Sequence, residues 1–231
     1  MKGFFVTGTD TDVGKTWFSG ALLHRLNQAG LETVAMKPVS AGCKWQDGQW
    51  QNDDALLLMR EMSSEADYQD VNPYAFEPAM APHLAAEQAG VEITFATIEE
   101  KLKLLTANDQ TVVIEGAGGW LVPLNKTQSV ADLAQSIGLP IIMVVSIRLG
   151  CLNHALLTAE SIQGSGLPLA GWVANIGERE YELANENIAS LQKRLKSPLI
   201  GRLPFTEKYM PQVLAKSLDY ELLLENIDLD Q

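Results

Sequence analysis

The sequence predicts an α/β fold in which a mostly parallel sheet is flanked by helices on both faces. Six short apolar runs alternate along the chain with stretches of helical periodicity. Each run is nearly continuous rather than alternating, as expected for strands that are covered on both faces. Because strand, helix and strand repeat, the strands should run parallel and connect through right-handed crossovers. With 231 residues, the chain can bury a sizeable core, and we expect a single domain over residues 1–231.

The alternation gives the order of the expected elements. The expected strands are the apolar runs at residues 4–6, 33–36, 112–114, 141–145, 172–174 and 198–200. The expected helices are the periodic stretches at residues 14–29, 53–62, 94–107, 129–137, 152–164 and 180–196. We expect a mobile loop at 42–51, an irregular excursion over one end of the sheet at 63–92, and an acidic, leucine-bearing helix or part-helix at 217–231.

Composition narrows the class of protein. A net charge of −12 and a pI near 4.6 weigh against nucleic acid and anionic membranes as partners. We find neither an apolar run long enough to span a bilayer nor the pattern of a signal peptide, so we expect a cytoplasmic protein. Two cysteines, Cys43 and Cys151, make neither a disulfide framework nor a zinc site, and we expect free thiols.

The stretch GTDTDVGKT at residues 8–16 has the context of a phosphate-binding loop, or P-loop. It follows the first expected strand, and its end, Gly14-Lys15-Thr16, opens the first expected helix. In such loops, backbone N–H groups and the helix N-terminus hold phosphate oxygens. Lys15 would reach the β- and γ-phosphates of ATP, and Thr16 would bind Mg²⁺ through its hydroxyl.

This loop is unusual in two ways. The spacing between Gly8 and the Gly14-Lys15 pair is one residue longer than in the common motif. The loop also places two carboxylates, Asp10 and Asp12, beside a site for an anion. The function of this loop must therefore include a role for negative charge beside the phosphates.

Two other strand ends carry residues suited to an ATP site, because ligands of parallel sheets bind at the carboxyl ends of the strands. The strand at 112–114 ends in Glu115 and is followed by Gly116-Ala117-Gly118-Gly119, which is like a Walker B acid next to glycines that a ligand can approach closely. The alternative is a strand-end acid before a plain glycine turn. Lys37 follows the second strand, and Pro38 stiffens the turn that would aim it at an anion. The alternative is a surface lysine.

Two helix starts are further candidates. One residue of Asn52-Asp53-Asp54 is expected to be an N-cap. A helix start that points at the ATP site would make Asp54 a third magnesium ligand, with Thr16 and Glu115. Gly150-Cys151-Leu152-Asn153 leads into a helix whose free N–H groups suit a carboxylate or phosphate. The alternatives are a plain cap and an ordinary strand-to-helix turn.

These pieces, in this order, resemble the motifs of the dethiobiotin synthetases, the ATP-dependent carboxylases of biotin synthesis. The resemblance runs along nearly the whole chain. Its motifs are GTDTDVGKT at 8–16, Lys37-Pro38-Val39, Asn72-Pro73-Tyr74, EGAGGW at 115–120, GCLNHALLT at 150–158 and GWVAN at 171–175.

The resemblance implies a homodimer with a P-loop NTPase-like fold of about seven strands. It also implies that 7,8-diaminononanoate, CO2 and ATP, with Mg²⁺, become dethiobiotin, ADP and phosphate. One amine takes up CO2 as a carbamate, and ATP phosphorylates the carbamate to a mixed anhydride. The second amine then displaces phosphate and closes the ureido ring.

Roles for individual residues follow from the same resemblance. Lys15 and Lys37 would bind the carbamate, because two lysines and Mg²⁺ offset the charge of two anions that react. Thr11 and Asp12 would face the diamine, since the widened loop borders both reactants and a carboxylate can hold an ammonium or accept its proton. The implied magnesium ligands are Thr16, Asp54 and Glu115. The implied ATP-binding residues are Asp12, Val13, Gly14, Lys15, Thr16, Trp17, Glu115, Gly116, Ala117, Gly118, Asn175, Pro204, Phe205 and Thr206, with Asn175 reading the adenine edge. The implied substrate-binding residues are Ser40, Ala41, Gly150, Cys151, Leu152 and Asn153, of which the last four would reach the substrate carboxylate across the dimer interface.

The chain departs from the family pattern at the substrate wall. Relatives usually carry Ser or Thr where this chain has Ala41, and Ser40 lies one position earlier. Either Ser40 supplies the hydroxyl contact from a shifted turn, or the contact is lost. The family's Ser-Pro-His is Ala81-Pro82-His83 here.

Two rival classes of protein fit this sequence less well. A ParA/MinD-like nucleotide switch has a close fold, but it carries a lysine early in the P-loop, where this chain has Thr9 and Asp10. Such switches also need a basic DNA surface or an amphipathic membrane helix, whereas this chain is acidic. A cobyrinate-type amidating synthetase needs a glutaminase domain with a nucleophilic cysteine, and neither cysteine lies in the context of a nucleophile elbow.

Overall fold

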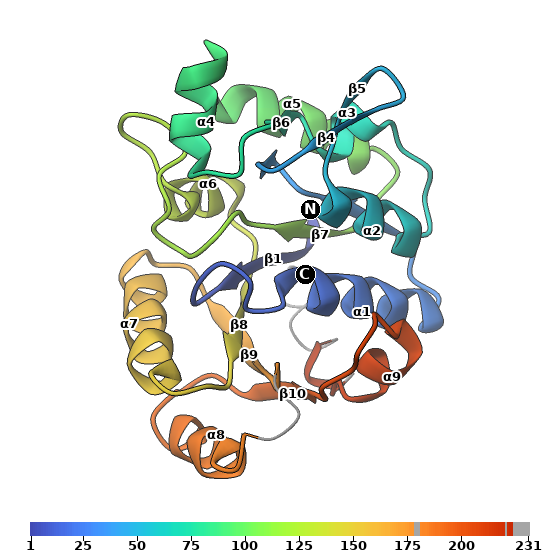
Figure 1. Ribbon diagram of the computed structural model, residues 1–231. Coiled ribbons are helices and arrows are strands. Elements are labelled where there is room, and N and C mark those ends of the chain that lie inside the picture. Colours follow the sequence, from blue (N-terminus) through green and yellow to red (C-terminus); the bar gives the residue numbers. More distant parts are fainter. Residues whose placement is uncertain (178–180, 220, 224–231) are drawn as a thin grey trace.

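The computed structural model describes residues 1–177, 181–219 and 221–223 (Figure 1). Within these residues a six-stranded parallel sheet has the order β10-β9-β8-β1-β7-β2. Its strands are β1 (Lys2–Gly8), β2 (Thr33–Met36), β7 (Thr111–Glu115), β8 (Ile141–Ser146), β9 (Leu169–Asn175) and β10 (Leu199–Leu203). The expected mostly parallel sheet is confirmed, with one strand fewer than the resemblance implies.

Helices cover both faces of this sheet. They include α1 (Lys15–Gln28), α2 (Asp53–Glu61), α5 (Phe95–Leu105), α6 (Val130–Ile137), α7 (Cys151–Gly164), α8 (Ala184–Gln192) and α9 (Pro211–Lys216). In Figure 1, α1 and α9 lie on one side of the sheet, and α6 and α7 lie on the other. Each expected strand and helix is present, with ends that differ by a few residues. Most of the expected C-terminal helix at 217–231 lies outside the described residues.

Two buried clusters of apolar side chains explain why the strands lack polar alternation. Phe4 and Val113 pack in the cluster that contains α1 and α9. Their chain neighbours Phe5 and Val112 pack in the cluster that contains α5, α6, α7 and α8. Because successive side chains point to opposite faces, a strand that is covered on both faces is apolar along its whole length.

The expectation of a mobile loop at 42–51 is wrong, since β4 (Lys44–Gln46) and β5 (Gln49–Gln51) form an antiparallel hairpin. Asp47 and Gly48 turn the chain with positive φ angles of 51° and 79°, and aspartate followed by glycine is typical of such two-residue turns. Trp45 and Trp50 pair across the strands, with ring centroids 5.3 Å apart. The Asp-Gly pair was therefore a hairpin signal in the sequence.

The expectation of an irregular segment at 63–92 is also partly wrong. This segment contains α3 (Tyr68–Val71), β6 (Tyr74–Ala75) and α4 (Pro82–Ala89), and β6 pairs in parallel with β3 (Val39–Ser40). Pro82 opens α4 rather than interrupting it, because the first helical position needs no N–H donor. The prolines of this segment therefore mark the ends of elements.

The order of the strands places the candidate site. From β1 the chain continues through α1 to β2, whereas from the adjacent β8 it continues through α7 to β9 on the other side of the sheet. Such a reversal between neighbouring parallel strands opens a crevice at their carboxyl ends. The segments after β1, β2, β7 and β9 all begin at this edge.

Both cysteines are buried and free. Among the described residues, no helix has the length and apolar character needed to cross a membrane.

Candidate active site

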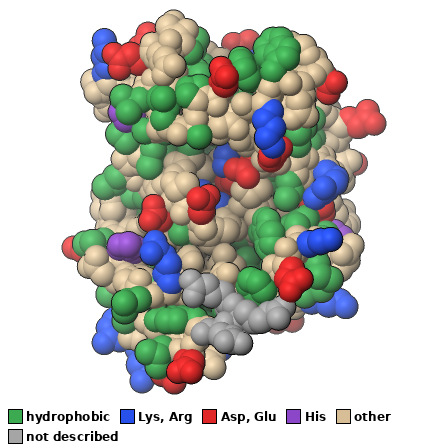
Figure 2. Space-filling view, viewed as in Figure 1, with side chains coloured by type: hydrophobic (Ala, Val, Ile, Leu, Met, Phe, Trp, Pro, Cys, Tyr) green, Lys and Arg blue, Asp and Glu red, His purple; other side chains and the backbone are tan. Residues whose placement is uncertain are grey.

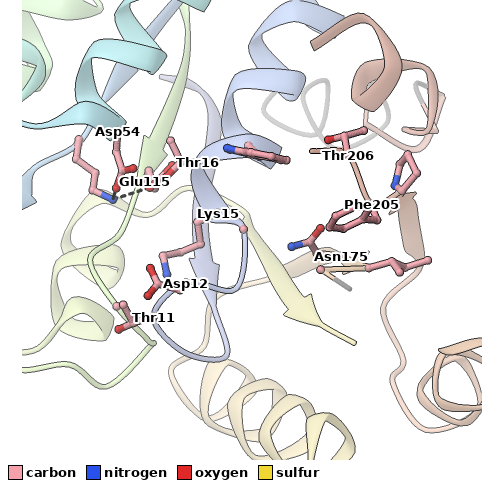
Figure 3. Close-up of a pocket in the computed structure, with 16 residues that line it drawn as sticks. Thr11, Asp12, Lys15, Thr16, Asp54, Glu115, Asn175, Phe205 and Thr206 are labelled. Atoms are coloured by element: carbon pink, nitrogen blue, oxygen red, sulfur yellow. Dashed lines mark hydrogen bonds and ion pairs between the residues drawn. The ribbon is translucent and has the colours of Figure 1, made fainter. Parts of the chain in front are cut away.

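A cavity of about 400 Å³ opens beside the P-loop at the carboxyl edge of the sheet. Figure 2 shows acidic and basic side chains gathered around a hollow at the centre of this face. Thr16, Asp54 and Glu115 lie together at one end of the cavity, and Asn175, Phe205 and Thr206 lie at the other (Figure 3). The residues that line it are Thr11, Asp12, Gly14, Lys15, Thr16, Trp17, Lys37, Asp54, Glu115, Gly118, Asn175, Ile176, Gly177, Pro204, Phe205 and Thr206.

The shape of the P-loop depends on a glycine and an asparagine. Gly14 caps α1 in the left-handed conformation, with φ at 95°, and a Cβ atom there would collide with the side chain of Asn175. The Asn175 amide donates to the carbonyl of Val13 over 2.9 Å. Asn175 therefore holds the loop from the end of β9, in addition to lining the cavity.

Asp10 now has a structural role, which the sequence left open. One carboxylate oxygen accepts from the Thr11 N–H over 2.8 Å, and the other lies 3.3 Å from a guanidinium nitrogen of Arg148. The Asp10 carbonyl accepts from Lys15 Nζ over 2.9 Å. Asp10 thus shapes the widened loop, and Arg148 is a partner that sequence reasoning missed.

Lys15 and Lys37 are both buried and lie close enough to affect each other. Burial, and then the charge of Lys37, lower the pKa of Lys15 to about 8. Burial alone would also lower the pKa of Lys37, but the charges of Glu115 and Asp54 outweigh it and raise that pKa above its usual value. Two ammonium groups that line one cavity are suited to an anion of high charge.

Lys37 joins two carboxylates from different elements. Its Nζ lies 2.5 Å from Glu115 Oε1, at the end of β7, and 3.1 Å from Asp54 Oδ2, in the first turn of α2. Burial tends to raise the pKa of Asp54, but the charge of Lys37 and its hydrogen bond lower it. Asp54 and Lys37 therefore hold each other in their charged forms.

The same group of oxygens fits a divalent cation. Glu115 is fully buried, Thr16 Oγ1 donates to its Oε1 over 2.9 Å, and its Oε2 has no hydrogen-bond partner among the described residues. A buried polar atom without a partner is costly. Thr16, Asp54 and Glu115 supply a hydroxyl and two carboxylates, which suits Mg²⁺ when phosphate oxygens and water complete the set. In the described part of the chain no cluster of three or more acids, histidines or cysteines could hold a metal by itself.

A second cavity, of about 580 Å³, adjoins the first. Thr11, Asp12, Lys37, Asp54 and Gly118 line both. The remainder of its wall is mostly apolar and includes Val39, Ser40, Ala41, Asn52, Ala79, Met80, Ala81, Pro82, Ala117 and Val122. Lys37 and Asp12 therefore border both cavities.

Some implied residues lie elsewhere. Val13 is buried and lines neither cavity within the described chain. Ser40 lines the second cavity, but its hydroxyl donates to Asn72 Oδ1 over 2.7 Å. Gly150, Cys151, Leu152 and Asn153 begin α7, with Gly150 as its left-handed N-cap, and within the described chain they line neither cavity. The neighbouring Leu149 is 88% exposed. A single chain thus does not bring this turn to the cavities.

Comparison with known proteins adds the family. A model of a family described as an AAA domain matches residues 2–213. The chain is 49% identical over 220 residues to the ATP-dependent dethiobiotin synthetase BioD of Pseudomonas paraeruginosa, which covers 95% of this chain and 96% of that protein. It is 44% identical over 225 residues to the protein of that name in Vibrio vulnificus, which covers 97% and 99%.

Solved structures agree in fold. The septum site-determining protein MinD complexed with Mg-ADP from Pyrococcus horikoshii superposes with a TM-score of 0.58 at 16% identity, and covers 99% of this chain and 97% of that one. A ParA family ATPase from Chlorobium tepidum gives a TM-score of 0.54 at 14% identity, with coverage of 98% and 96%. At these identities the likeness concerns the fold alone.

Proposed function

The chain belongs to the family of ATP-dependent dethiobiotin synthetases, and on this premise we propose how its residues perform the reaction. The substrates are 7,8-diaminononanoate, CO2 and ATP, and the products are dethiobiotin, ADP and phosphate. All 231 residues act as one synthetase domain. The observation that carries the proposal is the position of Lys37, which borders both cavities and touches both Asp54 and Glu115.

The first cavity takes the nucleotide. The P-loop N–H groups and Lys15 hold the phosphates, and the base lies toward Asn175 and Phe205, where Trp17 also lines the wall. Thr16, Asp54 and Glu115 would hold Mg²⁺, which neutralises charge that develops on the transferred phosphoryl group. This placement puts the γ-phosphate beside Lys37.

The second cavity takes the diamine. Its mostly apolar wall suits the methylene chain, and Asp12 and Thr11 border the side where both cavities meet. Asp12 holds an ammonium group or accepts its proton, so the amine can attack CO2 and form a carbamate. This role explains the carboxylate in the P-loop. Ala41 leaves the wall without a hydroxyl at that position, and Ser40 donates its own to Asn72.

Lys37 and Lys15 carry the phosphoryl transfer. The carbamate oxygen attacks the γ-phosphorus, ADP leaves, and a carbamic-phosphoric anhydride forms. Both lysines offset the approach of two anions. The second amine then attacks the carbonyl carbon, phosphate leaves with its electron pair, a proton is lost, and the ring closes.

A second copy of the chain completes the site. The turn formed by residues 150–153 presents N–H groups suited to the substrate carboxylate, yet it lies away from both cavities of its own chain. Leu149 and Leu157 are exposed on the same turn and helix. We therefore assign this surface to a homodimer interface.

The experiment that tests the function supplies the purified protein with 7,8-diaminononanoate, bicarbonate and Mg-ATP. Dethiobiotin, ADP and phosphate should appear in equal amounts. ATP hydrolysis without dethiobiotin, or stimulation by DNA or lipid vesicles, would instead support the nucleotide-switch class. The absence of a lysine at Thr9 and Asp10 disfavours that class.

A further inference from the structure

A buried polar network lies behind Lys37. At its centre is Asn72, which is 2% exposed. The Asn72 amide donates to the backbone carbonyl of Lys37 over 2.6 Å, and its Oδ1 accepts from Tyr68 Oη over 2.8 Å and from Ser40 Oγ over 2.7 Å. In the described structure Asn72 and Tyr68 line neither cavity. These two side chains therefore act on the site only through other residues.

The local sequence explains why a side chain is needed at this point. Lys37 donates its backbone N–H to the carbonyl of Val71 over 2.8 Å, so the two segments run side by side. In parallel pairing the carbonyl of Lys37 would next accept from the residue two positions after Val71, but that residue is Pro73, which has no N–H to donate. The Asn72 amide supplies the donor that backbone pairing cannot supply there.

The network continues from Tyr68 to Asp54, whose carboxylate contacts Lys37. Tyr68 Oη accepts from the backbone N–H of Asn52 over 2.8 Å. The Asn52 side chain caps α2 by accepting from the N–H of Asp54 over 3.1 Å. Asp54 then reaches Lys37 Nζ over 3.1 Å. Tyr68 is thus the link between the backbone of Lys37 and the helix start that carries Asp54.

The hydroxyl of Tyr68 is suited to this place. Burial raises its pKa to about 12, so it keeps its proton and donates to Asn72 while it accepts from Asn52. Inside a protein a satisfied polar network of this kind rigidifies its members, because each lost bond leaves a buried group without a partner.

We propose that Asn72 and Tyr68 are positioning residues for phosphoryl transfer, which fix the backbone of Lys37 and the first turn of α2 relative to each other. The proposal rests on the proposed function, in which Lys37 contacts the carbamate and Asp54 belongs to the magnesium site. It assigns to α3 and the two residues that follow it a role in catalytic rate rather than in ligand binding. A small displacement of a catalytic group lowers the rate strongly.

The test compares Tyr68→Phe with Tyr74→Phe. Both changes remove a buried tyrosine hydroxyl that accepts from a backbone N–H, since Tyr74 Oη accepts from Thr94 over 3.1 Å. Each variant should lower the Tm by roughly 2–4 °C. Tyr68→Phe should also lower kcat for dethiobiotin roughly tenfold, with KM for ATP within about twofold. Tyr74→Phe should leave kcat within about twofold of the unchanged protein.

The same substitution in a second variant protein distinguishes a positioning role of Tyr68 from a general loosening of the structure. In Asp54→Asn protein, Tyr68→Phe should change kcat by less than about twofold, because residues of one network have non-additive effects. Equal kcat values for the two tyrosine variants, or a full tenfold loss in the Asp54→Asn background, would overturn the proposal. Should Tyr68→Phe not fold, Asn72→Asp replaces it, because it keeps the acceptor oxygens but removes the donor to Lys37. A kcat loss then supports the proposal, and an unchanged kcat overturns it.

The same assays distinguish a failure of the proposed function from a failure of the positioning proposal. If the unchanged protein makes no dethiobiotin, the function is wrong whatever the tyrosine variants do. ADP release, measured in the same samples, still compares Tyr68→Phe with Tyr74→Phe.

Discussion

Lys37 Nζ lies 2.5 Å from Glu115 Oε1, and both side chains are shut away from solvent. Each charge therefore depends on the other, because a buried charge without its partner is costly. The pair also joins two segments that are far apart in the sequence, the end of β2 and the end of β7. The catalytic role proposed for Lys37 would thus couple catalysis to stability.

Replacing Lys37 by alanine should affect both activity and stability, and a second substitution at Glu115 is needed to separate the two effects. Lys37→Ala should abolish dethiobiotin formation while ATP still binds, since the P-loop is untouched. It should also lower the free energy of unfolding by about 3–5 kcal/mol, because Glu115 is left buried and unpaired. Adding Glu115→Gln should restore much of that stability but no activity. Calorimetric ATP titration, denaturant unfolding and product assay check the three parts, and loss of ATP binding would give Lys37 a nucleotide role.

The Lys15 ammonium predicts a pH dependence of nucleotide binding. Its pKa is lowered from 10.5 to about 8 by burial and then by Lys37. Between these values the folded protein binds fewer protons than the unfolded chain, so the contribution of Lys15 to the free energy of unfolding rises with pH there. Bound phosphates have the opposite effect and raise the pKa of Lys15, because their negative charge favours the protonated lysine.

ADP affinity should therefore fall as the pH rises above about 8, by up to about tenfold per pH unit, with proton uptake on binding. Calorimetry in buffers of different ionisation enthalpy measures that uptake. Lys15→Met is the control and should bind more weakly but with little pH slope in this range. An equal slope in both proteins would show that another group titrates.

The sequence predicted the parts of this site that lie within one local motif, and not the contacts between motifs. Lys15 and Thr16 follow from strand, loop and helix, and Glu115 follows from a strand end. Arg148 could not be assigned to Asp10, which lies 138 positions away, because nothing local to an arginine shows which acid it meets. The link from Asn72 to Lys37 was hidden for the same reason, since only the fold brings the two segments together.

Elements were missed where a local signal was misinterpreted. Asp47-Gly48 is typical of a tight hairpin turn, yet it lies in the segment 42–51 that was expected to be a mobile loop. Pro82 lies in the segment expected to be irregular, yet it opens α4. Tertiary contacts then stabilise these short elements, as the pairing of β3 with β6 shows.

Trp17 provides an optical test of the nucleotide cavity. It lines the wall together with Phe205, and its ring centroid lies 6.0 Å from that of Tyr209. We expect ADP to change the tryptophan fluorescence, and Trp17→Leu to remove that change and weaken ADP binding roughly tenfold, as for the loss of one aromatic–base stack. Trp45→Phe is the control, because Trp45 lies 61% exposed on the hairpin. A fluorescence change that survives in Trp17→Leu would place the base elsewhere.

The turn before α7 predicts that activity depends on dimer formation. Leu149 is 88% exposed beside the turn formed by residues 150–153, and Leu157 of α7 is 58% exposed, so this surface offers more than one apolar side chain to a partner. Leu149→Asp should shift the protein toward the monomer and lower dethiobiotin formation by roughly tenfold or more, because a buried charge at an interface costs several kcal/mol. ADP binding should persist, since the nucleotide cavity belongs to one chain. Sedimentation equilibrium and product assay measure both effects. Leu183→Asp, at a leucine 55% exposed before α8, should change neither. A Leu149→Asp protein that stays dimeric and fully active would exclude this surface from the interface.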